Sequence, residues 1–470
     1  MAQAEKSVLS SFWRQASTAI PPHCHSHTTI TMQNSSWKSR HSCDAFDAPR
    51  FYIHFDSHVL SISVGCPIAA MALGLLSKKL VASPVLSSAR FLSSEVAFQT
   101  KPYKLHKLET GPSNDVVLTK DDAMVYYRQM QLIRRMETAA GNLYKEKKIR
   151  GFCHLYSGQE ACAVGMKAAM EHDDALITAY RCHGWTYLFG ASTSEVLSEL
   201  TGKITGNVFG KGGSMHMYER NFYGGNGIVG AQQPLGAGVA LAMKYRKQKN
   251  ICLTLYGDGA ANQGQLFEAT NMAKLWNLPV LFVCENNGFG MGTAVERASA
   301  STEYYTRGDY IPGLWIDGMD VLAVRESIRW AKEYCNSGKG PLMLEMATYR
   351  YGGHSMSDPG TSYRTREEIQ EVRKTRDPIT GFKDRIITAG LAAEEELKAI
   401  DKDVRREVEK AVQVATSEGV LPPEALYADV YYNTEAQSIR GATVDETIVQ
   451  PFKTTPELLK SLGRDAKASF

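Results

Sequence analysis

The pattern of apolar and polar positions changes near residue 100 of the chain. Up to Phe91 no period of two or 3.6 residues is sustained, and Ser and His are frequent. We therefore expect no packed core in this stretch. Beyond Lys101, short apolar runs alternate with helical patterns. The folded part of the protein is predicted to lie there.

Four short apolar runs are candidate strands, and long connections separate them. Such spacing is typical of a parallel sheet covered by helices. We therefore predict an α/β fold in which helices flank a parallel sheet. The predicted strands are Ala175 to Tyr180, Ile251 to Tyr256, Pro279 to Cys284 and Leu342 to Ala347.

Three helices stand out beside these strands. The residues Thr119 to Asp122 resemble a capping box that opens a helix running through Met136. Apolar residues at helical spacing predict a crossover helix from Gln263 to Leu275. A further apolar stripe predicts a C-terminal helical extension, on which Asp401 and Arg405 would form an ion pair. This stripe consists of Leu397, Ile400, Val404, Val408, Ala411 and Ala415.

Polar residues follow two successive predicted strands. The segment Gly257-Asp258-Gly259 follows one strand and Asn286-Asn287 follows the next, with one helix between them. In a βαβ unit such residues lie side by side at the carboxyl ends of neighbouring strands, where α/β sheets bind ligands. Their oxygen atoms suit Mg²⁺ or Ca²⁺, and the glycines allow a diphosphate to approach the backbone. Either motif alone would indicate an ordinary turn; together they predict a metal-bridged diphosphate ligand.

Composition and charge exclude several classes of protein. Hydrophobic residues make up 43% of the chain and charged residues 22%, which excludes disorder, collagen and coiled coil as descriptions of the whole chain. The net charge is only +3, so no nucleic-acid partner is predicted. The 9 cysteines include no CxxC pair, which favours a reducing compartment over a disulfide scaffold.

The region before residue 100 contains a candidate targeting segment. Residues 71–95 are basic and Ser-rich, and they contain no acid before Glu95, as in a mitochondrial transit peptide. We expect translation to start at Met71 and cleavage to follow soon after Arg90. Residues 1–70 would then be a disordered extension or a mis-called start.

Two other interpretations of this region, a membrane span and a metal site, are less favoured. Residues 59–77 form an uncharged run of 19, but serines, glycines and a proline dilute it, so no membrane span is predicted. The cluster His23-Cys24-His25-Ser26-His27 contains metal-binding residue types, but no second pair of ligands lies at zinc-finger spacing. An unstructured tail is the preferred interpretation.

Five motifs give the chain a specific family resemblance. From about Lys101 to Asn433 it resembles the α subunits of the pyruvate dehydrogenase first component, which depend on thiamine diphosphate. The resemblance implies a thiamine-diphosphate-binding dehydrogenase domain over residues 100–435 and a C-terminal tail over 436–470. The motifs are Gly151 to Glu160, Gly210 to Met217, Tyr223 to Gln232, the unit from Gly257 to Asn287, and His354 to Gly360 followed by Tyr363 to Arg366.

The resemblance also implies roles for individual residues. Mg²⁺ would be bound by Asp258, Asn287 and the main-chain oxygen of Phe289, where the family often has Tyr. The cofactor's diphosphate would be held by Tyr180 and Arg181, whose planar guanidinium suits an anion. Further cofactor contacts would come from Gly227 and Val229 against the aminopyrimidine and from Gly257, Gly259 and Ala260 near the diphosphate.

Two histidines of these motifs are candidate catalytic residues. An imidazole of His154 or His354 near the thiazolium could stabilise the substrate carboxylate or transfer protons during acyl transfer. The third histidine, His216, lies between two methionines and is interpreted as a packing residue.

The implied reaction is oxidative decarboxylation of pyruvate in the mitochondrial matrix. The acetyl group would pass to the lipoyl group of the acyltransferase component and feed acetyl-CoA formation. No acid of this chain lies in a motif that would activate the aminopyrimidine, and in the family a β subunit supplies it. The chain alone should therefore be inactive, and an α₂β₂ heterotetramer is expected.

The resemblance implies regulation as well. Ser355 and Ser362 match serines that a kinase modifies in this family and that a phosphatase restores. A phosphate would repel the diphosphate and the substrate carboxylate and loosen the loop. Gly352 stands where the family usually has His, and Ala294 where a third such serine often lies, so at most two regulatory sites are predicted.

Three rival functions remain at this stage. A branched-chain 2-oxoacid dehydrogenase α subunit would share the fold and cofactor, although Asn262-Gln263-Gly264 and Met356-Ser357-Asp358-Pro359 favour the pyruvate type. A Rossmann NAD-binding protein is disfavoured, because no GxGxxG motif follows a strand with an acid about 20 positions later. A catalytically silent subunit that binds the cofactor is the third.

Overall fold

A computed structural model describes residues 29–33, 36–40, 95–431, 435, 437–440, 447–450 and 453–463. The chain divides into two units, Met1–Ala89 and Arg90–Phe470. In the first unit, β1 (Thr29–Gln33) pairs antiparallel with β2 (Ser36–Arg40), a hairpin that the sequence analysis did not predict. The predicted transit segment apart from Glu95, its cleavage position, the run over 59–77 and the His23 to His27 cluster lie outside the described residues.

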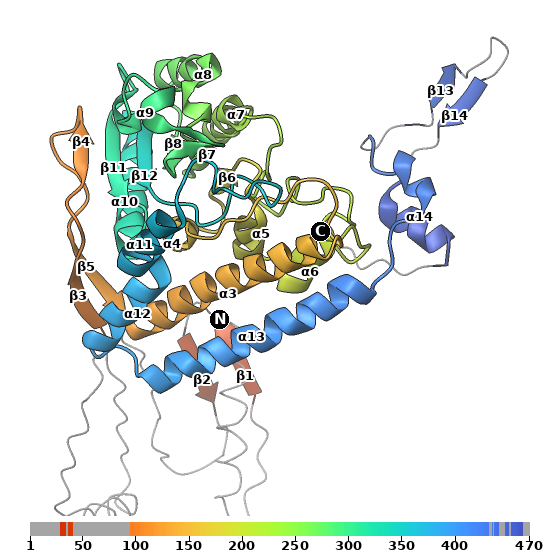
Figure 1. The fold of residues 1–470 in the computed structure, drawn as a ribbon, viewed down its shortest axis with the longest axis horizontal. Coiled ribbons are helices and arrows are strands. Elements are labelled where there is room, and N and C mark those ends of the chain that lie inside the picture. Colours follow the sequence, from red (N-terminus) through yellow and green to blue (C-terminus); the bar gives the residue numbers. More distant parts are fainter. Residues whose placement is uncertain are drawn as a thin grey trace, which may run out of the picture. The chain divides into compact units, whose positions relative to one another are not determined.

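A mostly parallel sheet forms the centre of the second unit (Figure 1). Its strand order is β4-β11-β12-β8-β7-β6, in which only β4 is antiparallel to its neighbour. The predicted α/β fold with a helix-flanked parallel sheet is therefore confirmed. The strands are β4 (Lys104–His106), β6 (Ala175–Ile177), β7 (Cys252–Gly257), β8 (Val280–Asn286), β11 (Gly313–Asp317) and β12 (Leu342–Ala347).

Alternating residues of the central strands enter two separate hydrophobic clusters. Leu253 and Leu255 of β7 join the cluster that contains side chains of α3 (Lys120–Lys145), α4 (Glu160–Ala169) and α10 (Val321–Tyr334). Cys252 and Tyr256 join the cluster that contains side chains of α7 (Gln232–Tyr245) and α8 (Gly264–Leu275). Because successive side chains of a strand point to opposite faces, both faces of the sheet are covered. The apolar runs are continuous for this reason.

The long helix α3 begins where the sequence predicts it. Thr119 is its N-cap, and the Thr119 side chain accepts a hydrogen bond from the N–H of Asp122. The helix continues to Lys145 rather than ending at Met136, because Ala140 and Leu143 extend the buried stripe.

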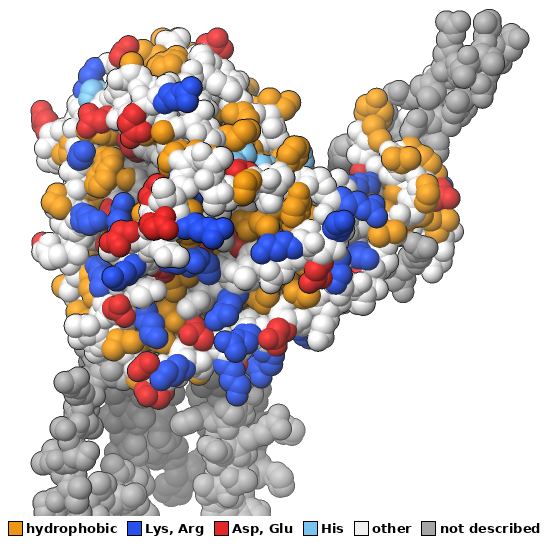
Figure 2. All heavy atoms as spheres, viewed as in Figure 1, with side chains coloured by type: hydrophobic (Ala, Val, Ile, Leu, Met, Phe, Trp, Pro, Cys, Tyr) orange, Lys and Arg blue, Asp and Glu red, His pale blue; other side chains and the backbone are white. Residues whose placement is uncertain are grey.

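The predicted C-terminal helix is α13 (Glu394–Ser417), which packs on α3 and on α6 (Thr193–Leu200) (Figure 1). The ion pairs Lys120–Glu396 at 2.7 Å and Arg128–Glu407 at 2.5 Å join α3 to α13. The predicted pair of Asp401 with Arg405 is not among the ion pairs of residues 95–431. Asp401 instead accepts a hydrogen bond from the Tyr127 hydroxyl at 3.1 Å. Figure 2 shows basic and acidic side chains intermingled on this face.

One predicted strand is shorter than expected, and two strands of the central sheet were not predicted. The strand that begins at Ala175 ends at Ile177, and the next residue, Thr178, donates its N–H to the main-chain oxygen of Gly224 in a loop. The residues from Thr178 to Arg181 therefore form a connection at the sheet edge. Strands β11 and β4 were not predicted, since β11 follows an irregular segment and β4 has only 3 residues.

The remaining described elements lie outside the central sheet. None of the helices in the described part of the chain is both long and apolar enough to cross a membrane. The other strands are β3 (Glu95–Gln99), β5 (Asp115–Thr119), β9 (Phe289–Gly290), β10 (Thr293–Ala294), β13 (Gln437–Arg440) and β14 (Thr447–Gln450). The other helices are α5 (His183–Phe189), α9 (Val295–Ala298), α11 (Arg366–Arg376), α12 (Pro378–Thr388) and α14 (Thr455–Ser461), with short 3₁₀ turns at Ala260–Asn262, Tyr304–Thr306 and Pro423–Tyr427.

Candidate active site

The ends of β7 and β8 bring Asp258 and Asn287 together. Gly257 and Glu285 are partners in the sheet, so Asp258 follows one strand where Asn287 follows its neighbour. Both side chains are buried. Burial raises the pKa of the Asp258 carboxyl above its ordinary value, although a hydrogen bond with the Asn287 backbone opposes this. A cation beside this carboxylate would favour its charged form.

A third oxygen lies next to these two residues. The Nη1 atom of Arg350 is 3.3 Å from the Asn287 side-chain oxygen and 3.3 Å from the main-chain oxygen of Phe289. One positively charged group therefore contacts two of the three predicted metal-binding oxygens. The backbones of Gly259 and Gly290 also approach closely, because a Cβ atom at Gly259 would lie 3.4 Å from the Gly290 Cα.

These oxygens form a ligand set that suits a hard divalent cation. A carboxylate, an amide oxygen and a carbonyl oxygen are groups that Mg²⁺ accepts, with water and phosphate completing its octahedron. In the described ranges no group of three or more His, Cys, Asp and Glu side chains is arranged to hold a metal. The Asp258 site differs from such clusters because only one of its protein ligands would carry a charge.

A second group of predicted residues surrounds the two candidate catalytic histidines. The ring centroid of His154 lies 4.4 Å from that of Tyr180 and 5.2 Å from that of His354. Arg181 is buried and donates to the main-chain oxygen of His354 at 2.5 Å and to that of Leu155 at 2.9 Å. The structure thus places Tyr180, Arg181 and both histidines in contact with one another.

Both candidate histidines are neutral near pH 7. Burial, together with the nearby Arg181 charge, lowers the pKa of His154 to about 3 and that of His354 to about 4. The Nδ1 atom of His154 interacts with the main-chain oxygen of His354 at 3.1 Å. In contrast, the buried Nδ1 of His354 has no hydrogen-bond partner within the described structure. This nitrogen is free to bind a polar group of a ligand.

The segment from His354 to Arg364 is hydrogen-bonded to Arg350. Asp358 accepts hydrogen bonds from the His354 N–H and from the Tyr363 hydroxyl, both at 2.6 Å. The Tyr363 hydroxyl also accepts from Arg350 at 3.1 Å. Ser355 is buried, and its hydroxyl lies 2.7 Å from that of Ser357, whereas Ser362 is exposed.

The predicted aminopyrimidine segment lies against the start of α8. The main-chain oxygen of Val229 accepts a hydrogen bond from Gln265 at 3.4 Å, and the Val229 side chain is half exposed. A Cβ atom at Gly227 would lie 3.1 Å from Nε2 of His216, so this histidine packs on that glycine.

A set of comparisons places the chain among known proteins. The model of the family described as dehydrogenase E1 component matches residues 128–424. The chain belongs to the dehydrogenase E1 component family. The predicted family resemblance is thereby confirmed.

Several curated relatives of the chain are named as alpha subunits of a pyruvate dehydrogenase E1 component. A probable mitochondrial pyruvate dehydrogenase E1 component subunit alpha from Caenorhabditis elegans is 80% identical over 375 residues, which cover 80% of this chain and 94% of the relative. The type II mitochondrial subunit alpha of Ascaris suum is 71% identical over 382 residues, covering 81% and 97%. The somatic mitochondrial subunit alpha of Bos taurus is 60% identical over 361 residues, covering 77% and 93%.

Three residues of the candidate site were not predicted from the sequence. Arg350 contacts two predicted metal-binding oxygens, although no role was predicted for it. Its position in the sequence could have indicated a role in the site, because it comes 3 residues after β12, the strand that neighbours β8. Glu137 and His183 were missed as well: their side chains interact at 2.9 Å, and His183 contacts the Ser214 hydroxyl, which accepts from the His154 N–H.

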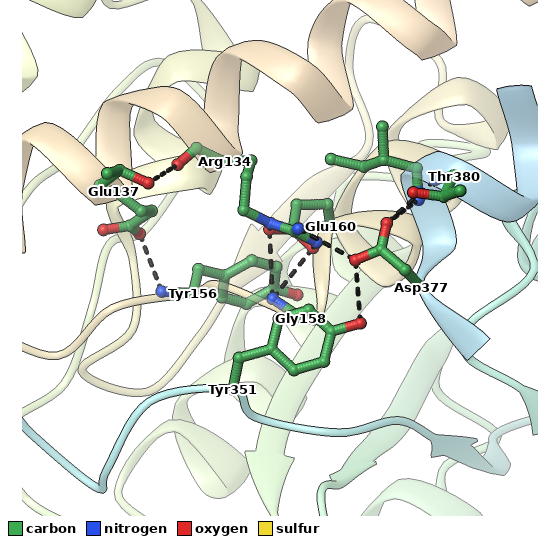
Figure 3. A network of polar contacts seen from close by, with 10 residues as sticks. Arg134, Glu137, Tyr156, Gly158, Glu160, Tyr351, Asp377 and Thr380 are labelled. Atoms are coloured by element: carbon green, nitrogen blue, oxygen red, sulfur yellow. Dashed lines mark hydrogen bonds and ion pairs between the residues drawn. The ribbon is translucent and has the colours of Figure 1, made fainter. Parts of the chain in front are cut away.

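A buried ion-pair network supports the segment that follows His154. Arg134 of α3 binds Glu160 with two of its nitrogens and Asp377 with the third (Figure 3). The Gly158 N–H donates to the Glu160 carboxylate, and the Tyr351 hydroxyl donates to Asp377 at 3.0 Å. The network therefore ties the start of α4 to the segment that carries Arg350. From the sequence, Glu160 was known only as the last residue of a motif, and this ion-pair network was not predicted.

Proposed function

We propose that the chain is the α subunit of a mitochondrial pyruvate dehydrogenase E1 component. It catalyses thiamine-dependent oxidative decarboxylation of pyruvate and transfer of the acetyl group to the lipoyl group of the acyltransferase, which feeds acetyl-CoA formation. The observation that carries this function is 60–80% identity over almost the full length of relatives that are all named for this activity. The same identity favours pyruvate over the branched-chain alternative.

We propose that Asp258, Asn287 and the Phe289 main-chain oxygen bind Mg²⁺, and that Tyr180 and Arg181 bind the diphosphate of the cofactor. The convergence of two of these oxygens on the Arg350 cation supports this assignment. The backbone at Gly257, Gly259 and Ala260 would lie against the diphosphate, and that of Gly227 and Val229 against the aminopyrimidine. When bound, thiamine diphosphate supplies the nucleophilic carbon and the electron sink that decarboxylation needs.

The residues of this chain have binding and positioning tasks in the proposed reaction. Because the pKa values of His154 and His354 lie near 3 and 4, each imidazole is neutral at pH 7 and can donate one hydrogen bond and accept another. The unpartnered Nδ1 of His354 is suited to a substrate or cofactor oxygen. Arg181 keeps its charge and can neutralise phosphate, because its pKa, although lowered to about 10 by burial and by Arg350, lies well above 7.

The proposed enzyme needs partners and is mitochondrial, as its relatives are named. A β subunit would supply the carboxylate that activates the aminopyrimidine, so that the working assembly is an α₂β₂ heterotetramer in the matrix. The lipoyl acyltransferase core would receive the acetyl group.

A regulatory kinase and phosphatase would act on Ser355 and Ser362. The Ser355 main-chain oxygen accepts from the Asp358 N–H at 3.0 Å, so a phosphate on Ser355 would add negative charge near the Asp358 carboxylate and would loosen the segment that Asp358 holds. We expect replacement of both serines by Ala to abolish inactivation by the kinase, and persisting inactivation would reject these sites.

Reconstitution with a β subunit tests the proposed function. Pyruvate-dependent release of CO₂ should require both subunits, thiamine diphosphate and Mg²⁺. A branched-chain enzyme would prefer 2-oxoisovalerate, and a silent subunit would bind the cofactor without turnover. Calorimetry on the tetramer carrying Asp258→Ala and Asn287→Ala should show cofactor binding lost; unchanged binding would refute the proposed site.

A further inference from the structure

A buried chain of polar side chains lies behind the candidate metal site. Oε1 of Gln159 accepts a hydrogen bond from Nδ2 of Asn287 at 3.1 Å. Nε2 of Gln159 donates to Oε1 of Glu285 at 3.4 Å, and the Tyr156 hydroxyl donates to the same Glu285 oxygen. Gln159 is 1% exposed, Glu285 6% and Asn287 7%, so water has little access to these contacts.

The order of these groups determines how both amides are oriented. Oε1 of Glu285 accepts hydrogen bonds from both the Tyr156 hydroxyl and Nε2 of Gln159, so Gln159 turns its NH₂ group toward Glu285. Its oxygen then faces Asn287, which must present its own NH₂ group. The Asn287 oxygen consequently points to the opposite side, where the Phe289 main-chain oxygen lies and Arg350 donates to both.

The backbone position of Gln159 does not explain its side chain. Gln159 is the N-cap residue of α4, where Ser, Thr, Asp or Asn is usual, and its side chain makes no capping hydrogen bond. Arg350 also favours the observed Asn287 orientation, but a cation bound by Asn287 would compete with Arg350 for the same oxygen. Gln159 binds the other end of the amide and does not compete.

We propose that Gln159, oriented by Glu285 and Tyr156, is a positioning residue that directs the Asn287 oxygen toward the cation. The inference rests on the proposed function, because it assumes that Asn287 binds Mg²⁺. Polar groups behind metal ligands commonly set ligand orientation in this way, and their loss weakens metal binding about 10–100-fold.

The first test is the substitution Gln159→Leu in the reconstituted tetramer. Mg²⁺ is titrated at a fixed concentration of thiamine diphosphate, and binding is followed by calorimetry rather than by turnover. We expect Mg²⁺ binding to weaken about 10-fold, because the Asn287 amide can then rotate. Gln131→Leu is the matched control: Gln131 lies on α3 and donates to Tyr127, so this variant should bind Mg²⁺ normally.

A conservative variant and a double-mutant cycle separate orientation from packing. Gln159→Met keeps the length of the side chain but offers Asn287 no oxygen, so it should weaken Mg²⁺ binding as Gln159→Leu does. Asn287→Asp offers an oxygen at either end, so adding Gln159→Leu to Asn287→Asp should change Mg²⁺ binding less than about twofold. An equal loss from Gln159→Leu in both backgrounds would indicate a packing effect and would overturn the proposal.

Asp258→Ala separates failure of this inference from failure of the proposed function. If Asp258→Ala leaves Mg²⁺-dependent cofactor binding intact, the metal site itself is wrong, and the inference falls with it. If Asp258→Ala abolishes binding but Gln159→Leu binds Mg²⁺ like the unchanged protein, only the orienting role is refuted. If Gln159→Leu does not assemble, Gln159→Met decides the matter, because normal Mg²⁺ binding by that variant contradicts the proposal.

Discussion

Each imidazole in the candidate site depends on its surroundings for its charge. His154 is buried beside the Arg181 guanidinium, and both effects disfavour a second positive charge. The neutral form is therefore fixed by structure over the whole physiological range. This property limits His154 to hydrogen bonding and proton acceptance, and it excludes a permanently cationic role near pH 7.

The lowered pKa of His154 predicts sensitivity of folding to acid. The unfolded chain binds a proton at this histidine below about pH 6.5, whereas the folded chain does so only near pH 3. Stability from this group is thus full above pH 6.5 and is lost as the pH falls toward 3. We expect His154→Gln to be less sensitive to acid than the unchanged protein, by about 2 kcal/mol between pH 7.5 and pH 5, in urea unfolding.

The exposed Asn142 of α3 provides the control for this measurement, because its side chain does not titrate. Asn142→Gln should leave the dependence of unfolding on pH unchanged. A His154→Gln protein that loses stability in acid as steeply as the parent would contradict the assigned neutral state.

The helices depend on polar groups at their ends as well as on their apolar stripes. Asp377 is the N-cap of α12 and accepts from the N–H groups of Ile379 and Thr380. The same carboxylate binds Arg134 and Tyr351 (Figure 3). One side chain thus begins a helix and neutralises a largely buried guanidinium.

Because Asp377 both caps α12 and pairs with Arg134, we expect Asp377→Ala to lower the free energy of unfolding strongly. Loss of the cap costs about 1 kcal/mol, and leaving Arg134 with one buried partner fewer raises the total to about 3 kcal/mol. Thr119→Ala removes only the cap of α3 and should cost about 1 kcal/mol. Both are measured as changes in the free energy of unfolding; equal values for the two variants would show that Arg134 does not need Asp377.

Sequence patterns located the buried elements well and the loops poorly. Strands β7, β8 and β12 match their predicted positions to within two residues, because a strand covered on both faces is apolar throughout. Arg350 could not be found in this way: its contacts with Asn287 and Phe289 depend on the pairing of β12 with β8 and on the path of the following loop. The Gln159 contacts depend likewise on where α4 packs.

At the scale of the whole molecule, the N-terminal boundary remains a prediction. The second unit begins its described structure with β3 at Glu95, and β3 pairs with β5. Cleavage shortly after Arg90 would therefore leave the first strand of this unit complete. We expect N-terminal sequencing of the mature mitochondrial protein to begin between Phe91 and Glu95; a start beyond Gln99 would remove β3 and contradict the predicted transit segment.

The packing of α13 on α3 also has a consequence for synthesis on the ribosome. Lys120 and Arg128 emerge early, but their partners Glu396 and Glu407 are translated more than 250 residues later. α13 can cover its side of α3 only after most of the chain has been translated. The stripe of α3 that faces α13 therefore stays exposed on the nascent chain until most of the chain has been made, although α4 and α5 can pack on other sides of α3 much earlier.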